Sequence, residues 1–166
     1  MTIDSETETG TREQFKVYNH VAPTVSELDM QVIKSVPPGG NWEDIPLSVA
    51  EKSKRIMQIR KSGGRTTYYG RLRNDLPSYT VSTYFHRPGN GSFVHPEQDR
   101  MISVREAARL QSFFDDHRFL GPASSQYKQV GNAVPPLLGR AVGVTIPSGF
   151  AVDLFCGAGG LSHGLR

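Results

Sequence analysis

Apolar positions in the first part of the chain recur at helical spacing and predict two helices. The first runs from a capping box at residues 24–27 to the two prolines at 37–38. The second opens at Pro46 and continues through Ile59 to the two glycines at 63–64. The basic residues of this region begin on the second predicted helix.

A strictly alternating segment in the middle of the chain predicts a β-strand. Residues 78–85 place one set of side chains on a single face, namely Tyr79, Val81, Thr83 and Phe85. Residues 88–91 have turn chemistry, so Phe93 and Val94 are expected to return as a partner strand.

A second capping box, at residues 103–106, predicts a helix over residues 104–113. Ile102 and Ala107 are spaced to form a hydrophobic staple across its first turn. The expected buried stripe of this helix consists of Ala107, Ala108, Leu110 and Phe114.

The C-terminal part predicts a helix, a connector and a buried strand. The turn at residues 131–136 leads into a helix with the apolar members Leu137, Leu138, Ala141 and Val142. A connector at residues 144–149 follows. Residues 150–155 are then an almost continuous apolar run, as expected of a strand buried in a parallel sheet, and they lead into the glycines at 157–160.

A buried strand that leads into closely spaced glycines and a helix start is the arrangement that nucleotide-like cofactors use. Glycine lets the backbone approach a ligand, and the helix start offers free amides. The third glycine of a dinucleotide fingerprint is absent here, so a purely structural turn is the alternative. Only six residues follow Gly160, so we expect a second polypeptide to supply the neighbouring strands and an acidic residue for the cofactor ribose.

Composition limits the classes of function. The chain has 166 residues, 37% of them hydrophobic, without an apolar run near the roughly 20 residues of a membrane span or a secretory signal. A cytoplasmic protein that does not contact a membrane is therefore expected. Cys156 is the single cysteine, which excludes an internal disulfide, and the five histidines lack metal-ligand spacing. No metal site is expected.

Charge is unevenly distributed along the chain. Residues 1–14 are polar and are expected to form a disordered tail. Between Glu51 and Asp75, eight lysine and arginine residues face two acidic ones, although the net charge of the whole chain is only +3. This segment fits polyanion binding and a solvated basic helix face equally well.

Three segments together resemble the signature motifs of the bacterial DNA cytosine-5 methyltransferases. Residues 152–162 resemble the first motif of that family, the cofactor-binding strand and glycine loop. Residues 95–114 resemble the ninth motif, and residues 127–136 resemble the tenth. Upstream, residues 38–46 and 70–80 resemble the later part of the target-recognition region.

The chain departs from the usual family pattern in two ways. The tenth motif precedes the first, which resembles the circularly permuted members, and the short connector at 144–149 can join them. The nucleophilic cysteine of the family lies in a Pro-Cys loop, which this sequence lacks along with the assisting Glu-Asn-Val segment. Cys156 follows Phe155 in the glycine loop, so we interpret it as a loop residue and expect no catalytic residue in this chain.

The resemblance implies an α/β fold: a partial Rossmann-like, S-adenosylmethionine-dependent methyltransferase fold with a small α+β target-recognition lobe, completed by a partner chain. The expected division after the tail is a target-recognition part at 15–94, a ninth-motif helix region at 95–125, a tenth-motif region at 126–143, the connector at 144–149, and a first-motif strand, glycine loop and helix start at 150–166.

The resemblance also implies the site residues. The cofactor is S-adenosylmethionine, with Phe155 beside its adenine, Asn132 and Val134 closing its methionine end, and Asp153 bracing the loop. The full set of expected cofactor-binding residues is Asn132, Ala133, Val134, Asp153, Phe155, Gly157, Ala158, Gly159, Gly160 and Leu161. The candidate contacts to double-stranded DNA are Arg65, Arg71, Arg73 and Thr80.

The function that the resemblance implies is that of one subunit of a DNA cytosine-5 methyltransferase of a restriction-modification system. A second methyltransferase polypeptide would supply the Pro-Cys loop, and the isolated chain would be inactive. The alternatives are a non-catalytic DNA-binding or regulatory module and a fragment of a longer permuted enzyme. A nicotinamide-dependent oxidoreductase is suggested by the glycine loop alone, and the ninth and tenth motifs argue against it.

Overall fold

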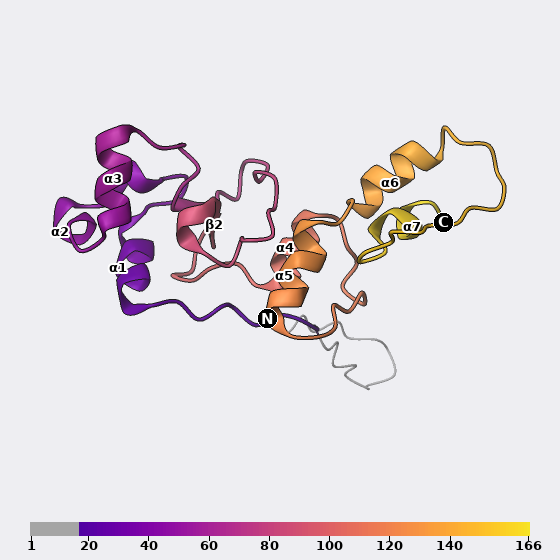
Figure 1. Cartoon of the computed structure of the whole chain (residues 1–166), viewed down its shortest axis with the longest axis horizontal. Coiled ribbons are helices and arrows are strands. Elements are labelled where there is room, and N and C mark those ends of the chain that lie inside the picture. The colour runs from indigo at the N-terminus through magenta and orange to yellow at the C-terminus, as the bar shows by residue number, and fades with distance from the viewer. Residues whose placement is uncertain (1–16) are drawn as a thin grey trace, which may run out of the picture.

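The computed structural model describes residues 17–166, so the predicted disordered tail at 1–14 lies outside the described residues. Helices α1–α3 lie at one end of an elongated arrangement and α6 and α7 at the other (Figure 1). In chain order the elements are α1 (Glu27–Ser35), η1 (Trp42–Asp44), α2 (Leu47–Ala50), α3 (Lys54–Ser62), β1 (Gly70–Arg71), η2 (Pro88–Asn90), β2 (Ser92–Val94), α4 (Val104–Leu110), α5 (Ala123–Gly131), α6 (Pro136–Gly143) and α7 (Gly160–Gly164).

Both predicted N-terminal helices form, with different boundaries. The amide of Asp29 donates to Ser26 Oγ over 3.1 Å, so Ser26 rather than Thr24 caps α1. The single helix predicted from Pro46 is divided into α2 and α3, because Ser53 Oγ accepts from the Ile56 amide and starts a new helix.

Two clusters of buried side chains hold the chain together. The first joins α1, α2 and α3 around Trp42 and comprises Val32, Val36, Trp42, Ile45, Ala50, Ile56, Ile59 and Tyr69. The second lies under β2, α4 and α5 and comprises Ile33, Val81, Phe85, Phe93, Val94, Met101, Ile102, Val104, Ala107, Ala108, Phe113, Phe119 and Val130. The two clusters meet at α1, which contributes to both.

A two-stranded parallel sheet replaces the predicted hairpin. β1 pairs with β2, with Gly70 opposite Ser92, whereas residues 78–82 are irregular and residues 83–85 belong to a turn. The predicted strand at 78–85 is therefore wrong, because β2 pairs with β1 instead. The predicted face is confirmed only in part, since Val81 and Phe85 are buried but Tyr79 is exposed.

The capping box of α4 is confirmed, and its predicted stripe is corrected. Ser103 Oγ accepts from the Glu106 amide, and the Glu106 carboxylate accepts from the Ser103 amide. Ala107 and Ala108 are buried as expected, but Leu110 and Phe114 are exposed. The helix ends at Leu110, and Ser112 with a φ of 61° turns the chain so that Phe113 is buried instead.

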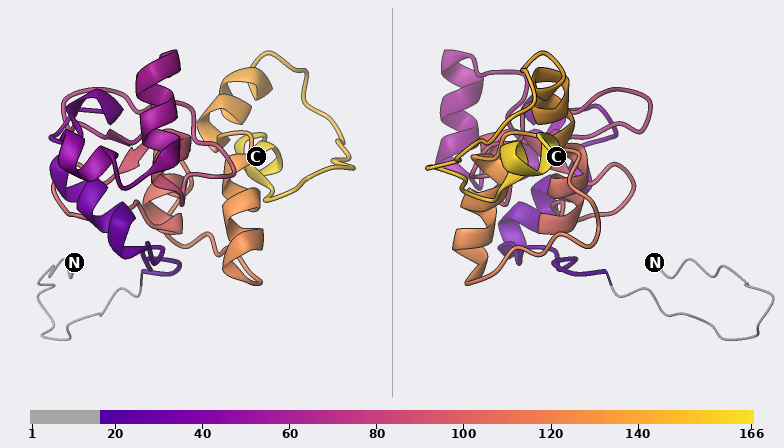
Figure 2. Two further views of the ribbon diagram at one scale, coloured as in Figure 1. Left: turned by 60° about the vertical axis from the view of Figure 1, so that its left-hand side comes forward. Right: turned by 90° about the vertical axis from the view of Figure 1, so that its right-hand side faces the viewer.

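The C-terminal segment differs most from the expectation. Residues 150–155 are not a strand, and Phe150 and Phe155 are 110% and 97% exposed. No strand lies beside them within residues 17–166, so their backbone has no ladder to join. The connector and this segment arch away from α6 before the chain returns at α7 (Figures 1 and 2).

α5 is a helix that the sequence analysis did not predict.

Arg71 is a buried residue that ties distant segments together. Its guanidinium donates five hydrogen bonds of 2.6–3.0 Å, to the backbone carbonyls of Ile33, Val36, His95 and Gln98 and to the carboxylate of Asp99. These bonds join α1, β1 and the segment before α4. The Arg71 side chain is only 5% exposed and four of its five acceptors are backbone carbonyls, so Arg71 belongs to the core.

Replacing Arg71 by alanine removes the guanidinium donor from the carbonyls of Val36 and His95, and one of two donors from those of Ile33 and Gln98. It should lower the free energy of unfolding by about 3 kcal/mol. Arg71→Lys should not restore stability, because an ammonium cannot reproduce the planar fork. Urea unfolding of the full chain, followed by the fluorescence of Trp42, measures the change. The exposed Arg73→Ala is the matched control and should leave the stability almost unchanged. Equal losses for the two variants would contradict the structural role of Arg71.

Candidate functional site

A pocket of about 280 Å³ lies where α5 and the turn after it face the glycine loop. Its lining comes from two segments that the sequence assigns to the tenth and the first motif. The lining residues are Ser125, Lys128, Gln129, Asn132, Ala133, Val134, Asp153, Phe155, Cys156, Gly157, Ala158 and Leu161. Two motifs that are separate in the sequence therefore form one concave surface.

The pocket brings together eight of the ten residues expected to bind the cofactor, and Gly159 and Gly160 do not line it. Gly160 is buried beneath the loop instead. The sequence analysis missed four lining residues: Ser125, Lys128, Gln129 and Cys156. The three from α5 precede Asn132 at spacings of seven, four and three residues, so one face of an unrecognised helix was the available signal.

Asp153 ties together both ends of the glycine loop. Its carboxylate accepts a hydrogen bond from the Phe155 amide over 3.2 Å and another from Ser162 Oγ over 2.5 Å. Between these points Gly157 and Gly159 have φ values of 51° and 74°, which favour glycine. The result is a tight loop whose backbone at Gly157, free of a side chain, lines the pocket.

Close packing of α6 against α7 holds the two walls of the pocket together. A Cβ added to Gly160 would lie 2.1 Å from the carbonyl oxygen of Val134, and one added to Gly164 would lie 2.2 Å from that of Pro136. Both obstacles are backbone atoms that cannot rotate away. Glycine at these positions therefore allows the start of α7 to sit directly on the turn that carries Asn132 and Val134.

Phe85 and His86 pack on the helix that lines the pocket. The ring of His86 stacks on Tyr127 of α5 with centroids 4.2 Å apart, and Phe85 meets the same ring edge-on at 5.2 Å. Burial lowers the pKa of His86 and raises that of Tyr127. Residues 78–87 and the pocket therefore share α5 as a common support.

The structure separates the four candidate DNA contacts. Arg65 and Thr80 are exposed. Arg73 is exposed and forms a two-point ion pair with Asp75, with N–O distances of 2.8 and 2.5 Å. The interpretation of Arg71 as a DNA contact is corrected, because its guanidinium is buried and engaged within the chain. Three candidates are left on the surface.

A model of the family described as C-5 cytosine-specific DNA methylase matches residues 5–148, which is well over half of the sequence. The chain belongs to this family. The match stops before the glycine loop, so it covers the ninth-motif and tenth-motif segments but not residues 150–166.

Similar proteins include several Type II enzymes. The Type II methyltransferase M.AgeI of Thalassovita gelatinovora is 52% identical over 92 residues, which cover 55% of this chain and 21% of that protein. M.Eco47II of Escherichia coli is 40% identical over 116 residues, covering 70% and 27%. The Type II methylase M.HgiDII of Herpetosiphon aurantiacus is 37% identical over 134 residues, covering 76% and 36%. This methylase chain thus spans between about a fifth and a third of the length of these relatives.

Among residues 17–166, no helix combines the length and apolar character that crossing a membrane requires. Over the same residues, no three side chains of His, Cys, Asp or Glu are grouped so that they could hold a metal ion.

The charged side chains of α4 brace the chain. Arg105 is fully buried and donates to the carbonyls of Tyr18, Phe114 and His117. Arg109 forms an exposed two-point pair with Asp115. Both arginines of α4 are therefore engaged with other groups of the chain.

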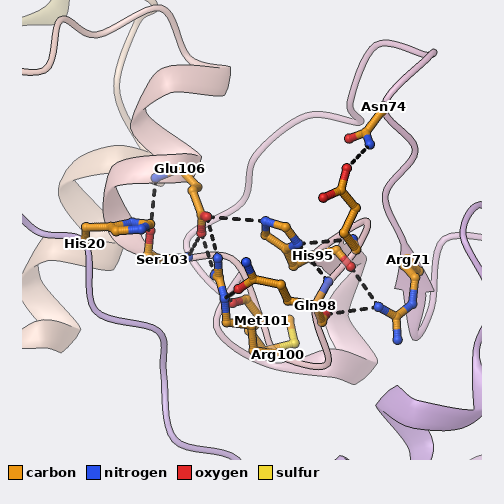
Figure 3. Close-up of polar contacts among 10 residues, drawn as sticks. His20, Arg71, Asn74, His95, Gln98, Arg100, Met101, Ser103 and Glu106 are labelled. Atoms are coloured by element: carbon orange, nitrogen blue, oxygen red, sulfur yellow. Dashed lines mark hydrogen bonds and ion pairs between the residues drawn. The ribbon is translucent and has the colours of Figure 1, made fainter. Parts of the chain in front are cut away.

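Glu106 is the centre of the polar network before and within α4 (Figure 3). Its two oxygens accept from Arg100 over 2.6 and 2.7 Å, and one of them also accepts from the Ser103 amide. Burial alone raises the pKa of Glu106, but the hydrogen bonds from Arg100 and Ser103 outweigh it and lower the pKa to about 2. The carboxylate is therefore ionised in the folded chain.

His95 closes the same network. Its Nδ1 accepts from the amides of Glu97 and Gln98 over 3.1 and 3.0 Å, so the neutral ring carries its proton on Nε2, which lies 3.5 Å from Glu106 (Figure 3). Burial and the nearby Arg100 lower the pKa of His95, which favours this neutral form. The ring thus stays neutral while the charge of Glu106 is balanced by Arg100.

The low pKa of Glu106 predicts a loss of stability in acid. Its stabilisation is complete above the ordinary pKa of 4.5 and is lost as the pH falls from 4.5 to about 2. This shift corresponds to about 3 kcal/mol as an order of magnitude. Glu106→Gln should flatten this acid limb in urea unfolding measured between pH 2 and pH 7. A variant whose stability still falls as steeply as that of the wild type would show that other groups cause the loss.

Proposed function

We propose that this chain is one subunit of a DNA cytosine-5 methyltransferase of a restriction-modification system in the bacterial cytoplasm. It would contribute target-recognition elements and part of an S-adenosylmethionine site, and a partner polypeptide would supply the catalytic cysteine. The observation that carries the proposal is the pocket formed jointly by residues 125–134 and the glycine loop. Family membership supplies the chemistry.

The residues of the pocket fit S-adenosylmethionine. Phe155 offers an aromatic face for the adenine, and the backbone at Gly157, which also lines the pocket, can approach the ligand. Asn132 and Val134 close the end at which the methionine part would lie, and Asp153 keeps the loop in shape. When bound, the cofactor supplies the methyl group. The volume of about 280 Å³ lies near the lower limit of ligand sites, which supports completion by further walls.

The exposed apolar segment favours a partner chain. Phe150, Val152, Leu154 and Phe155 are all largely exposed. Burying such a side chain contributes roughly 1.5–3 kcal/mol, so covering several of them would drive a stable association. Parallel strands of a partner sheet are the occupant that suits this run, because they would satisfy its backbone as well as its side chains. The completed sheet would be the Rossmann-like part of the fold.

The packing of α6 on α7 supports the permuted motif order. The two helices are neighbours in space, and residues 144–149 begin the link between them. A tenth-motif helix can therefore lead into a first-motif loop without disturbing either. In this arrangement one chain carries both walls of the pocket, and the reactive thiol and the remaining sheet come from the partner.

Reconstitution tests the proposal directly. The full chain, the product of a neighbouring candidate gene, and the mixture of both are assayed for transfer of labelled methyl groups to DNA. We expect activity in the mixture alone. DNA binding without methyl transfer in the mixture would point to a regulatory module instead. Methyl transfer by this chain alone would overturn the division of labour.

Asn132→Ala should weaken S-adenosylmethionine binding by the assembled enzyme by about tenfold, because one polar contact to the methionine part is lost. Association with the partner should be unchanged, since Asn132 lies on the pocket and not on the apolar segment. Calorimetry measures the first quantity, and size-exclusion chromatography measures the second. Unchanged cofactor affinity would refute the role of Asn132.

Arg65 and Arg73 are expected to contact DNA phosphates. Each alanine variant should weaken DNA binding by the assembled enzyme and reduce the slope of log affinity against log salt by about one. Arg109→Ala is the matched control for Arg73→Ala, because both arginines form exposed two-point pairs with an aspartate. A salt slope reduced equally by Arg109→Ala would remove the assignment to the loop arginines.

A further inference from the structure

The pocket contains one cationic side chain among its lining residues, that of Lys128. Its one carboxylate, Asp153, already accepts hydrogen bonds from Phe155 and Ser162. A ligand that enters this pocket with a negative charge therefore meets a single opposite charge, and that charge comes from α5.

The polar side chains of α5 that line the pocket differ in whether they already form hydrogen bonds within the chain. Gln129 Nε2 donates to the carbonyl of Leu120 and to Ser125 Oγ, over 2.8 and 3.1 Å. Lys128 and Asn132 make no side-chain hydrogen bond within residues 17–166. They are four residues apart, so they lie one above the other on the same face of the helix end.

The opposite wall has a different character. Phe155, Ala158 and Leu161 present apolar surface there, beside the glycine backbone. A ligand with an aromatic base at one end and a carboxylate at the other would be oriented by this polarity. Its base would lie against the loop, and its carboxylate would lie beside Lys128 and Asn132.

We infer that Lys128 binds the α-carboxylate at the amino-acid end of the methyl donor. This inference rests on the proposed function and extends it to a residue outside the expected cofactor set. The ammonium donates to the carboxylate oxygens as a point charge on a flexible stem, which suits the rim of a pocket that a partner closes. A DNA phosphate is the competing anion, and the test separates the two.

Two nucleoside probes isolate the carboxylate. S-adenosylhomocysteine carries the amino-acid end without the sulfonium charge, and 5′-methylthioadenosine lacks the amino-acid end. Both are titrated calorimetrically into the full chain, alone and mixed with its partner. Lys128→Gln should weaken binding of S-adenosylhomocysteine about tenfold and leave that of 5′-methylthioadenosine unchanged. Lys128→Arg should restore most of the loss, because the positive charge is retained.

Lys34→Gln is the control, because Lys34 is an exposed lysine on α1. This variant should change neither affinity. If Lys128→Gln weakened the binding of both probes equally, or weakened the binding of neither, the inference would be overturned and the proposed function would stand. A reduced salt slope of DNA binding with unchanged S-adenosylhomocysteine affinity would assign Lys128 to a phosphate and overturn it too. Failure of the wild type to bind either probe in either preparation would overturn the cofactor role itself.

Discussion

The close approach of α7 to the turn before α6 is the constraint on which the pocket depends. At Gly160 and Gly164 the two segments touch through backbone atoms, so any side chain there would force the walls apart. Asp153 then fixes the loop that precedes α7, by accepting from Phe155 and Ser162. Backbone contacts between α7 and the segment at Val134 and Pro136 therefore position the pocket. The side chains that line it are themselves largely exposed.

Arginine serves three different purposes in this chain, and burial decides which. Arg71 and Arg105 are buried and donate to backbone carbonyls, so they connect segments that are far apart in the sequence. Arg100 neutralises the buried Glu106 and lowers its pKa. Arg65 is exposed, and Arg73 is exposed with one carboxylate partner, which leaves their charges able to meet a polyanion.

Two regions of the chain meet at α5. One face of this helix lines the pocket through Lys128 and Asn132, and Tyr127 packs against His86 and Phe85. A displacement of His86 or Phe85 would therefore be felt by the helix that lines the pocket. Phe150, Val152 and Leu154 are exposed and do not line the pocket, so they form a separate apolar surface.

The sequence by itself determined features that depend on neighbours along the chain: the capping box at Ser103 and Glu106, the helix after residue 135, and eight of the twelve residues that line the pocket, which it found through motif resemblance. Tertiary structure decided the rest. Whether residues 78–85 or 150–155 become strands depends on a pairing partner, and whether Arg71 is free depends on distant carbonyls. Helix caps are satisfied locally, whereas strand pairing and arginine burial are settled only when remote segments meet.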